Sequence, residues 1–342
     1  MKTFRFIILI TILTLVLAAC GLSSTPAATP TAPPEPAIPA VKPFRVAVIM
    51  PSAANDLAFS QSMYDALVRV QNDMGGPDKM QFVYSQGMAI IADAAAALRT
   101  YASKDYDLVI AHGSQYGDSI REIAPEFPAV SFAWSNATKP TDLPNVFDMV
   151  AASQEGGYVN GVLAASLTTS KVIGVIGPVE AGEPKGYVDG FKAGVIATNP
   201  EIQVNVNYIG SFSDVVKASD VATGYISAGT DIMTGTSQMV VGPIGKANEN
   251  DVLWFGTQSN QTSLAPRIVV ANQVYHWEVA LKEVIAKLQA GTIGGESFTI
   301  NLANGGEVIE YNPDYALPPQ TKALGDATVK GIVGKTISVP LP

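Results

Sequence analysis

The stretch Arg45-Val-Ala-Val-Ile-Met-Pro51 and the segment that follows it decide the fold class. A short β-branched run is typical of a buried strand, and the apolar residues after it recur at the spacing of a helix. These apolar residues are Phe59, Met63, Leu67, Val70 and Met74. The sequence therefore predicts a strand that leads into a helix, which Gly75-Gly76-Pro77 ends.

The turn between this strand and this helix, at residues 55–60, is a candidate wall of a ligand site. In an open α/β sheet, ligands dock where the carboxyl end of a strand leads into a helix, because the first N–H groups of the helix have no partners there. The alternative is a capped turn that binds nothing. This stretch taken alone leaves both interpretations open.

Strand-like and helical segments alternate in two series along the chain, one within residues 44–152 and one within residues 171–271. Such βαβ alternation builds a mostly parallel sheet, so two series predict an α/β protein with two lobes and a cleft between them. We expect an N-terminal lobe of residues 44–152 plus 272–342. Whether the tail crosses the hinge once more stays open at this point. Residues 153–271 form the expected C-terminal lobe.

The N-terminal residues predict export and anchoring. Lys2 and Arg5 precede an apolar run that ends in Leu17-Ala-Ala-Cys20, which is typical of a signal peptide at residues 1–19. Small residues before Cys20 resemble a bacterial lipobox, which implies cleavage before Cys20 and its lipidation; a chance cysteine after an ordinary signal peptide is the alternative. Seven prolines in residues 21–43 make residues 20–43 a predicted extended tether. We expect an extracytoplasmic lipoprotein at the cell membrane.

Charge and residue usage argue against several functions. The net charge of −9 disfavours binding to nucleic acid and to anionic lipid surfaces, because both attract basic patches. Cys20 is the only cysteine, and His112 and His276 are the only histidines. The chain therefore has too few thiols and imidazoles for nucleophilic catalysis or for a zinc site, so we expect no enzyme, no metal and no cofactor.

Aromatic and polar side chains near strand ends suit reversible binding of a small molecule. Aromatic rings can sandwich a flat or sugar-like ligand, and amides or carboxylates beside them can bind its polar edge. Core packing or a solvated loop is the alternative for each residue taken singly. The candidates are Phe59, Tyr116, Trp134, Trp254 and Trp277, with Asp56, Asp118, Asn136, Gln238, Gln258 and Asn260.

Several segments in the same order resemble the basic membrane protein family of bacterial lipoproteins, which includes purine nucleoside-binding receptors of ABC transporters. The matching segments are Asp56-Leu-Ala-Phe59-Ser-Gln-Ser-Met-Tyr64, Asp107-Leu-Val-Ile-Ala-His-Gly113, Glu155-Gly-Gly-Tyr158-Val-Asn-Gly161, Gly190-Phe-Lys-Ala-Gly194 and Ser259-Asn-Gln261. The resemblance implies a type I periplasmic-binding fold, with about three hinge crossovers and closure around a ligand.

The resemblance also implies roles for individual residues. It makes Phe59 the ring that stacks on a base and places Asp118 in the turn after the second strand. The family's acidic residue at the end of the first strand falls at Met50, and its opposing aromatic falls at Met233. Its ribose-binding aspartate falls at Gln258, and the neighbouring lysine falls at Tyr275.

These observations predict a lipid-anchored, monomeric substrate-binding protein that passes a small, nucleoside-like solute to an ABC permease and its ATPase. Two alternatives stay open: a sensory receptor that signals to a membrane partner, and a surface hydrolase. The expected ligand-contacting residues are Asp56, Phe59, Ser60, Tyr116, Asp118, Trp134, Met233, Gln258 and Tyr275.

Overall fold

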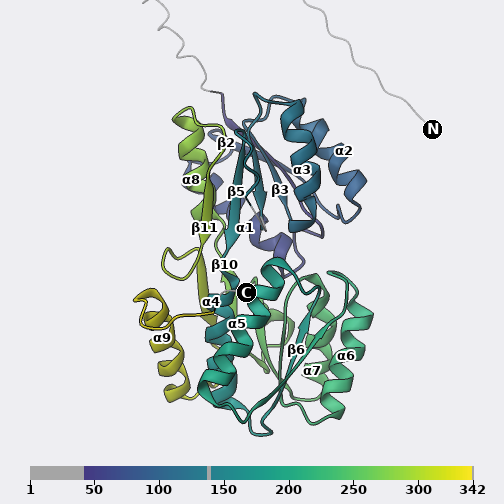
Figure 1. Cartoon of the computed structure of the whole chain (residues 1–342), viewed down its shortest axis with the longest axis vertical. Coiled ribbons are helices and arrows are strands. Elements are labelled where there is room, and N and C mark those ends of the chain that lie inside the picture. Colours follow the sequence, from purple (N-terminus) through teal and green to yellow (C-terminus); the bar gives the residue numbers. More distant parts are fainter. Residues whose placement is uncertain (1–41, 137–139, 341–342) are drawn as a thin grey trace, which may run out of the picture. The chain divides into compact units, whose positions relative to one another are not determined.

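The computed structural model describes residues 42–136 and 140–340. The predicted signal peptide, Cys20 and most of the predicted tether lie outside the described residues. Two six-stranded sheets form within them, and helices cover both faces of each sheet (Figure 1). No helix among residues 42–136 and 140–340 combines the length and the apolar character that a bilayer crossing requires.

The first sheet has the strand order β11-β5-β4-β3-β1-β2, and all its pairs are parallel. Its strands are β1 (Phe44–Ile49), β2 (Met80–Ser85), β3 (Leu108–His112), β4 (Phe132–Ser135), β5 (Val146–Ala151) and β11 (Ser297–Ile300). Its helices are α1 (Phe59–Asp73), α2 (Ile91–Ala102), α3 (Gly117–Ile123) and α8 (Glu278–Gln289).

Alternation along β1 distributes side chains to the two faces of this sheet. Val46 and Val48 pack with α1 and α8, whereas Ile49 packs with α2 and α3. Successive residues of a strand point to opposite faces, so a strand covered on both sides is apolar throughout. The β-branched run read from the sequence is therefore a central strand, flanked by β2 and β3.

The second sheet has the order β12-β10-β9-β8-β6-β7, and β12 runs antiparallel to β10. Its strands are β6 (Val172–Gly177), β7 (Gln203–Tyr208), β8 (Ile232–Gly235), β9 (Leu253–Gln258), β10 (Val269–Tyr275) and β12 (Glu307–Tyr311). Its helices are α4 (Ser153–Leu167), α5 (Gly182–Thr198), α6 (Val215–Ser227), α7 (Val241–Glu249) and α9 (Pro319–Val333). Helices α4, α5 and α9 pack on one face of this sheet, and α6 and α7 pack on the other.

Glycines allow α4 and α5 to pack with their backbones in contact. A Cβ atom at Gly161 would overlap the carbonyl oxygen of Phe191, and one at Gly194 would overlap that of Tyr158. Gly157 and Gly190 face the partner helix in the same way. The close approach therefore depends on residues without a side chain.

The chain crosses between the two sheets three times, between β5 and α4, between β10 and α8, and between β11 and β12. The segment after residue 272, which the sequence assigns to the N-terminal lobe, is divided between the sheets. Helix α8 and β11 belong to the first, whereas β12 pairs with β10 of the second, from Ala271↔Tyr311 to Tyr275↔Glu307. This pairing carries the tail back across the hinge.

Candidate ligand-binding site

A narrow pocket lies where the carboxyl ends of the two sheets meet. Its space is about 20 Å³, which is room for one water molecule. Every lining residue follows a strand or ends one, because loops after parallel strands gather at one edge of a sheet. The first lobe contributes Pro51, Phe59, Ser114, Gln115 and Asn136, and the second contributes Glu183, Pro184, Phe212, Ser237, Gln238 and Gln258.

Hydrogen bonds hold the lobes together beside this pocket. Ser259 Oγ donates to the carbonyl oxygen of Ala58 at 2.8 Å, and Gln261 Nε2 donates to that of Leu57 at 3.2 Å. Both donors follow β9 of the second lobe, and both acceptors precede α1 of the first. The structure is therefore a closed arrangement of the two lobes.

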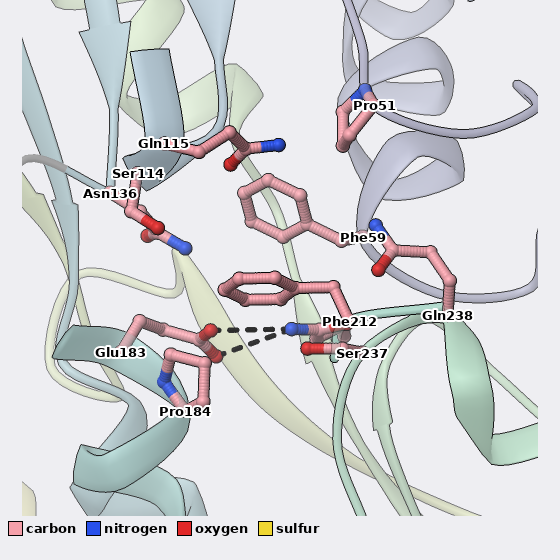
Figure 2. Close-up of a pocket in the computed structure, with 11 residues that line it drawn as sticks. Pro51, Phe59, Ser114, Gln115, Asn136, Glu183, Pro184, Phe212, Ser237 and Gln238 are labelled. Atoms are coloured by element: carbon pink, nitrogen blue, oxygen red, sulfur yellow. Dashed lines mark hydrogen bonds between the residues drawn. The ribbon is translucent and has the colours of Figure 1, made fainter. Parts of the chain in front are cut away.

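Two phenylalanine rings line the pocket near each other, Phe59 from the first lobe and Phe212 from the second (Figure 2). The Phe59 ring is held from behind by a parallel stack on His112, with ring centroids 3.8 Å apart and an interplanar angle of 8°. The Trp277 ring packs edge-on against the Phe59 ring, with the ring centroids 6.3 Å apart. The first-lobe wall is thus rigidly packed, whereas Phe212 is only half-buried.

His112 serves this packing as a neutral ring. Burial lowers the pKa of His112 to about 3. Its Nε2 lies 2.9 Å from the Phe59 carbonyl oxygen, which can only accept, so Nε2 carries the proton. Its Nδ1 then accepts from the Ser135 hydroxyl. Both ring nitrogens are occupied by structural hydrogen bonds.

The polar part of the pocket contains unsatisfied hydrogen-bond acceptors. Three buried side-chain oxygens that line it have no partner among the described residues: Asn136 Oδ1, Gln238 Oε1 and Gln258 Oε1. Glu183 adds a carboxylate, and none of the described lining residues carries a positive charge. Buried acceptors without donors are unfavourable, so these oxygens suit a ligand that brings N–H or O–H groups.

Glu183 receives hydrogen bonds from two residues of different strands. The Tyr275 hydroxyl, at the end of β10, donates to Oε1, and Gln258 Nε2 lies 3.4 and 3.3 Å from the two carboxylate oxygens (Figure 2). Burial raises the pKa of Glu183 to about 7, although these hydrogen bonds lower it in part. Gln258 and Tyr275 are the positions at which the family resemblance implies an aspartate and a lysine.

Strained backbone accompanies the pocket at three strand ends. Asn136, Ser237 and Gln258 have positive φ angles of 58°, 77° and 68°. Residues other than glycine rarely adopt this left-handed region of the backbone, and each one that does costs of order 1–3 kcal/mol. Backbone strain of this kind is concentrated at functional sites, so its presence here agrees with a ligand-binding role.

The structure brings Phe59, Asn136, Gln238 and Gln258 into the pocket and places the other sequence candidates around it. Asp56 accepts hydrogen bonds from the backbone N–H groups of Ala58, Ser60 and Gln61 and thereby shapes the turn before α1. The Ser60 hydroxyl is fully buried and bonds to Ser52. Both residues support the Phe59 wall but do not line the pocket.

Most aromatic candidates are core residues. Tyr116 donates its hydroxyl hydrogen to the Met88 carbonyl oxygen, and Trp134 donates its ring N–H to that of Gly113. Trp277 donates to Ser62, and Trp254 donates to Gln261. Burial of these rings leaves them outside the pocket lining, although Trp277 contacts Phe59.

Other candidates also lie away from the ligand space. Met50 and Met233 are fully buried in the hydrophobic core, so Met233 does not oppose Phe59. Asp118 is fully exposed on α3 and faces Arg121 at 3.6 Å. Asn260 Nδ2 donates to Glu310 at 2.6 Å. Tyr275 reaches the site through Glu183 rather than by lining it.

Sequence reasoning missed several lining residues, Glu183 and Phe212 above all. The available signal was position, because both follow strands of the second series, β6 and β7. Applying the strand-end rule to every strand finds both residues. Residues 42–136 and 140–340 hold no group of three or more His, Cys, Asp or Glu side chains placed for an ion.

Comparison with known proteins decides the family. The family model Bmp, described as "ABC transporter substrate-binding protein PnrA-like", matches residues 44–340. The chain belongs to this family. The resemblance to basic membrane proteins that the sequence motifs suggest is thereby confirmed.

Two curated relatives of this PnrA-like chain have names that state a ligand. The ABC transporter nucleoside-binding protein BmpA of Lactococcus lactis is 25% identical over 311 residues, which cover 84% of this chain and 86% of the relative. A purine-binding protein of Brucella abortus is 26% identical over 251 residues, covering 73% and 70%.

A solved structure supports the fold of the PnrA-like chain. The solute-binding protein of an ABC transporter system from Conexibacter woesei superposes with a TM-score of 0.71 at 24% identity, covering 87% of this chain and 99% of that one. The predicted periplasmic-binding fold, with two mostly parallel sheets flanked by helices, is confirmed.

Proposed function

We propose that this PnrA-like protein is the lipid-anchored receptor of an ABC importer and captures a small, flat solute by hinge closure. The observation that carries this proposal is that Phe59 of one lobe and Phe212 of the other line the same pocket (Figure 2). Only the closed arrangement brings both rings to one ligand. Ligand binding therefore shifts the population toward the closed form, which a permease can distinguish from the open one.

The proposed ligand is a nucleoside or a nucleobase-like compound. Two apolar rings fit the faces of a heteroaromatic base, and the amides of Asn136, Gln238 and Gln258 fit its polar edge. The names of the Lactococcus and Brucella relatives support the same ligand class. A pocket of about 20 Å³ is far smaller than such a molecule, so the hinge must open for entry and the lobes must stay further apart around the bound ligand than they are in this structure.

Release of the ligand unaltered completes the proposal. The family consists of substrate-binding proteins, and the imidazole nearest the pocket, His112, has both ring nitrogens engaged. Chromatography of a nucleoside panel after long incubation with the purified protein tests this point. Conversion of any member would revive the hydrolase alternative.

A thermal-shift screen over nucleosides, nucleobases and sugars tests the ligand class. Ligand at about a hundred times its dissociation constant stabilises the folded protein by about 2.7 kcal/mol, so a true ligand gives a clear rise in melting temperature. Titration calorimetry then measures affinity. Stabilisation by sugars alone would contradict the nucleoside assignment.

The anchor and the importer role need separate experiments in cells. We expect the Cys20→Ala variant to leave the membrane fraction, because lipid attachment requires that thiol. Loss of the permease partner should abolish ligand uptake and leave binding by the purified protein unchanged. Retention of Cys20→Ala at the membrane would contradict the proposed anchor.

A further inference from the structure

We propose that Glu183 is the specificity-determining residue of the pocket: its carboxylate accepts N–H or O–H donors of the ligand and excludes anions. The site would then take neutral, donor-rich or cationic ring compounds and reject phosphorylated ones. This inference rests on the proposed receptor function and names the ligand chemistry of the same pocket.

The position of Glu183 directs its carboxylate toward the ligand space. Glu183 lies in the first turn of α5, next to Pro184, which also lines the pocket. Figure 2 shows the carboxylate pointing inward, near Phe212 and opposite Asn136. The side chain therefore borders the pocket beside Phe212.

The carboxylate keeps free capacity for a ligand. A carboxylate offers about four acceptor sites on its two oxygens. Tyr275 and Gln258 share Oε1, and among the described residues only Gln258 Nε2 donates to Oε2. These two residues fix the orientation of Glu183 and leave Oε2 able to accept a further donor.

The remaining pocket lining strengthens the selection for donors. Asn136 of the first lobe and Gln238 and Gln258 of the second each have an unpartnered side-chain oxygen, and no described lining residue carries a positive charge that could neutralise a negative ligand. A phosphate brought here would meet a carboxylate and unpaired acceptors in a desolvated site, which is strongly unfavourable. A ligand amino group, ring N–H or hydroxyl would pair with them.

Protonation of Glu183 gives this role a measurable signature. Burial raises the carboxyl pKa of Glu183 to about 7, so the deprotonated carboxylate, which can only accept hydrogen bonds, predominates above neutral pH. The titratable groups whose charges interact with it are Tyr275 on β10, Tyr187 on α5 and Glu307 on β12. Burial raises the pKa of all three. The affinity for a donor ligand should rise with pH as Glu183 loses its proton.

Titration calorimetry of the full chain with adenosine, inosine and adenosine 5′-monophosphate tests the inference. Wild type should bind at least one nucleoside, more tightly at pH about 8 than at pH about 6, and should not bind the monophosphate. Glu183→Gln should weaken nucleoside binding about tenfold or more and flatten the pH profile, because it keeps the shape but removes the charge. Glu180→Gln, at an exposed residue of the same loop, is the matched control and should match wild type.

Tyr275→Phe keeps the test decisive if Glu183→Gln does not fold. Removing the hydroxyl deletes a hydrogen bond that lowers the pKa of Glu183, so the midpoint of the pH profile should move upward. Nucleoside binding that Glu183→Gln leaves unchanged in strength and pH profile would overturn this inference and leave the receptor function standing, and so would an unmoved midpoint in Tyr275→Phe. Failure of wild type to bind either nucleoside would overturn the nucleoside receptor proposal and, with it, this inference.

Discussion

Ser259 of the second lobe donates a hydrogen bond to the backbone carbonyl of Ala58 in the first lobe, at 2.8 Å. Ala58 immediately precedes Phe59, so this contact joins the lobes directly beside the proposed stacking wall. In the proposed mechanism, hinge closure would thereby position the binding residues as well as enclose the ligand.

Removing this contact should favour the open form. We expect Ser259→Ala to weaken ligand binding about two- to tenfold, since one hydrogen bond of the closed state is lost at about 0.5–1.5 kcal/mol. The radius of gyration of the unliganded protein, measured by small-angle X-ray scattering, should increase. Ser227→Ala removes an exposed hydroxyl that bonds only within α6 and serves as control. Unchanged affinity and scattering would refute a closing role for Ser259.

The two phenylalanines should separate binding from stability. Phe59→Ala and Phe212→Ala should each reduce affinity about tenfold or more, because each removes one of the two phenylalanine rings that line the pocket. Phe59 is only 5% exposed, so its removal should also lower the free energy of unfolding by about 3–5 kcal/mol. Phe212 is half-buried, so Phe212→Ala should lower the free energy of unfolding much less. Calorimetry and urea unfolding measure the two effects, and equal stability losses would contradict this assignment.

Packing of α4 against α5 should tolerate no added methyl group. Gly161→Ala should lower the free energy of unfolding by about 1–3 kcal/mol, because its Cβ atom would overlap the Phe191 carbonyl oxygen. Gly224→Ala is the matched control: a Cβ atom added to this helical glycine would meet nothing within 4 Å, and alanine should stabilise α6 by about 1 kcal/mol. Denaturant unfolding of both variants decides, and a neutral Gly161→Ala would disprove the tight contact.

Glu307 links the three crossings of the hinge and should matter as an acceptor rather than as a charge. Its Oε1 accepts from the Gly156 backbone N–H at 3.1 Å and from Gln273 Nε2. Burial raises the pKa of Glu307 well above its usual range. Glu307→Gln should therefore change stability little, whereas Glu307→Ala should cost about 1–3 kcal/mol for each donor left unpaired. Equal losses in the two variants, measured by urea unfolding, would contradict this account.

Glu183 should make the unliganded protein less stable as pH rises. Its pKa is about 7 when folded and about 4.5 when unfolded, so between these values the native state holds a proton that the unfolded state has released. The stabilisation is complete below about pH 4.5 and is lost as pH rises through about 7. Urea unfolding of wild type and Glu183→Gln at about pH 5 and about pH 8 isolates this difference, because the other carboxyls cancel. A pH-independent difference would refute the raised pKa.

Local patterns in the chain were enough to predict much of the fold. The β-branched run before Pro51 and the helical spacing from Phe59 onward predict β1 and α1, and both form. Period and turn chemistry act over a few residues, so one sequence reveals them. Phe59 was identified for the same reason, since the strand-end rule needs only a strand and the loop after it.

The candidate site could be predicted only in part. Trp134 and Tyr116 also follow or end strands, yet their rings turn into the core, and a residue's place in a loop does not reveal which way its side chain points. The family resemblance placed the second aromatic ring of the site at Met233. The second ring in the pocket is instead that of Phe212, which follows a different strand. Side-chain direction depends on packing against elements far away in sequence.

The sequence by itself determined the order of strands and helices, the two-lobed class and the family, because hydrophobic periodicity and motif order are properties of neighbouring residues. Only the tertiary structure decided that Glu183, Gln258 and Tyr275 meet. These residues lie on one helix and two strands of the second lobe, and they come together because β6, β9 and β10 are parallel strands of one sheet whose carboxyl ends, with the helix that follows β6, meet at the same edge.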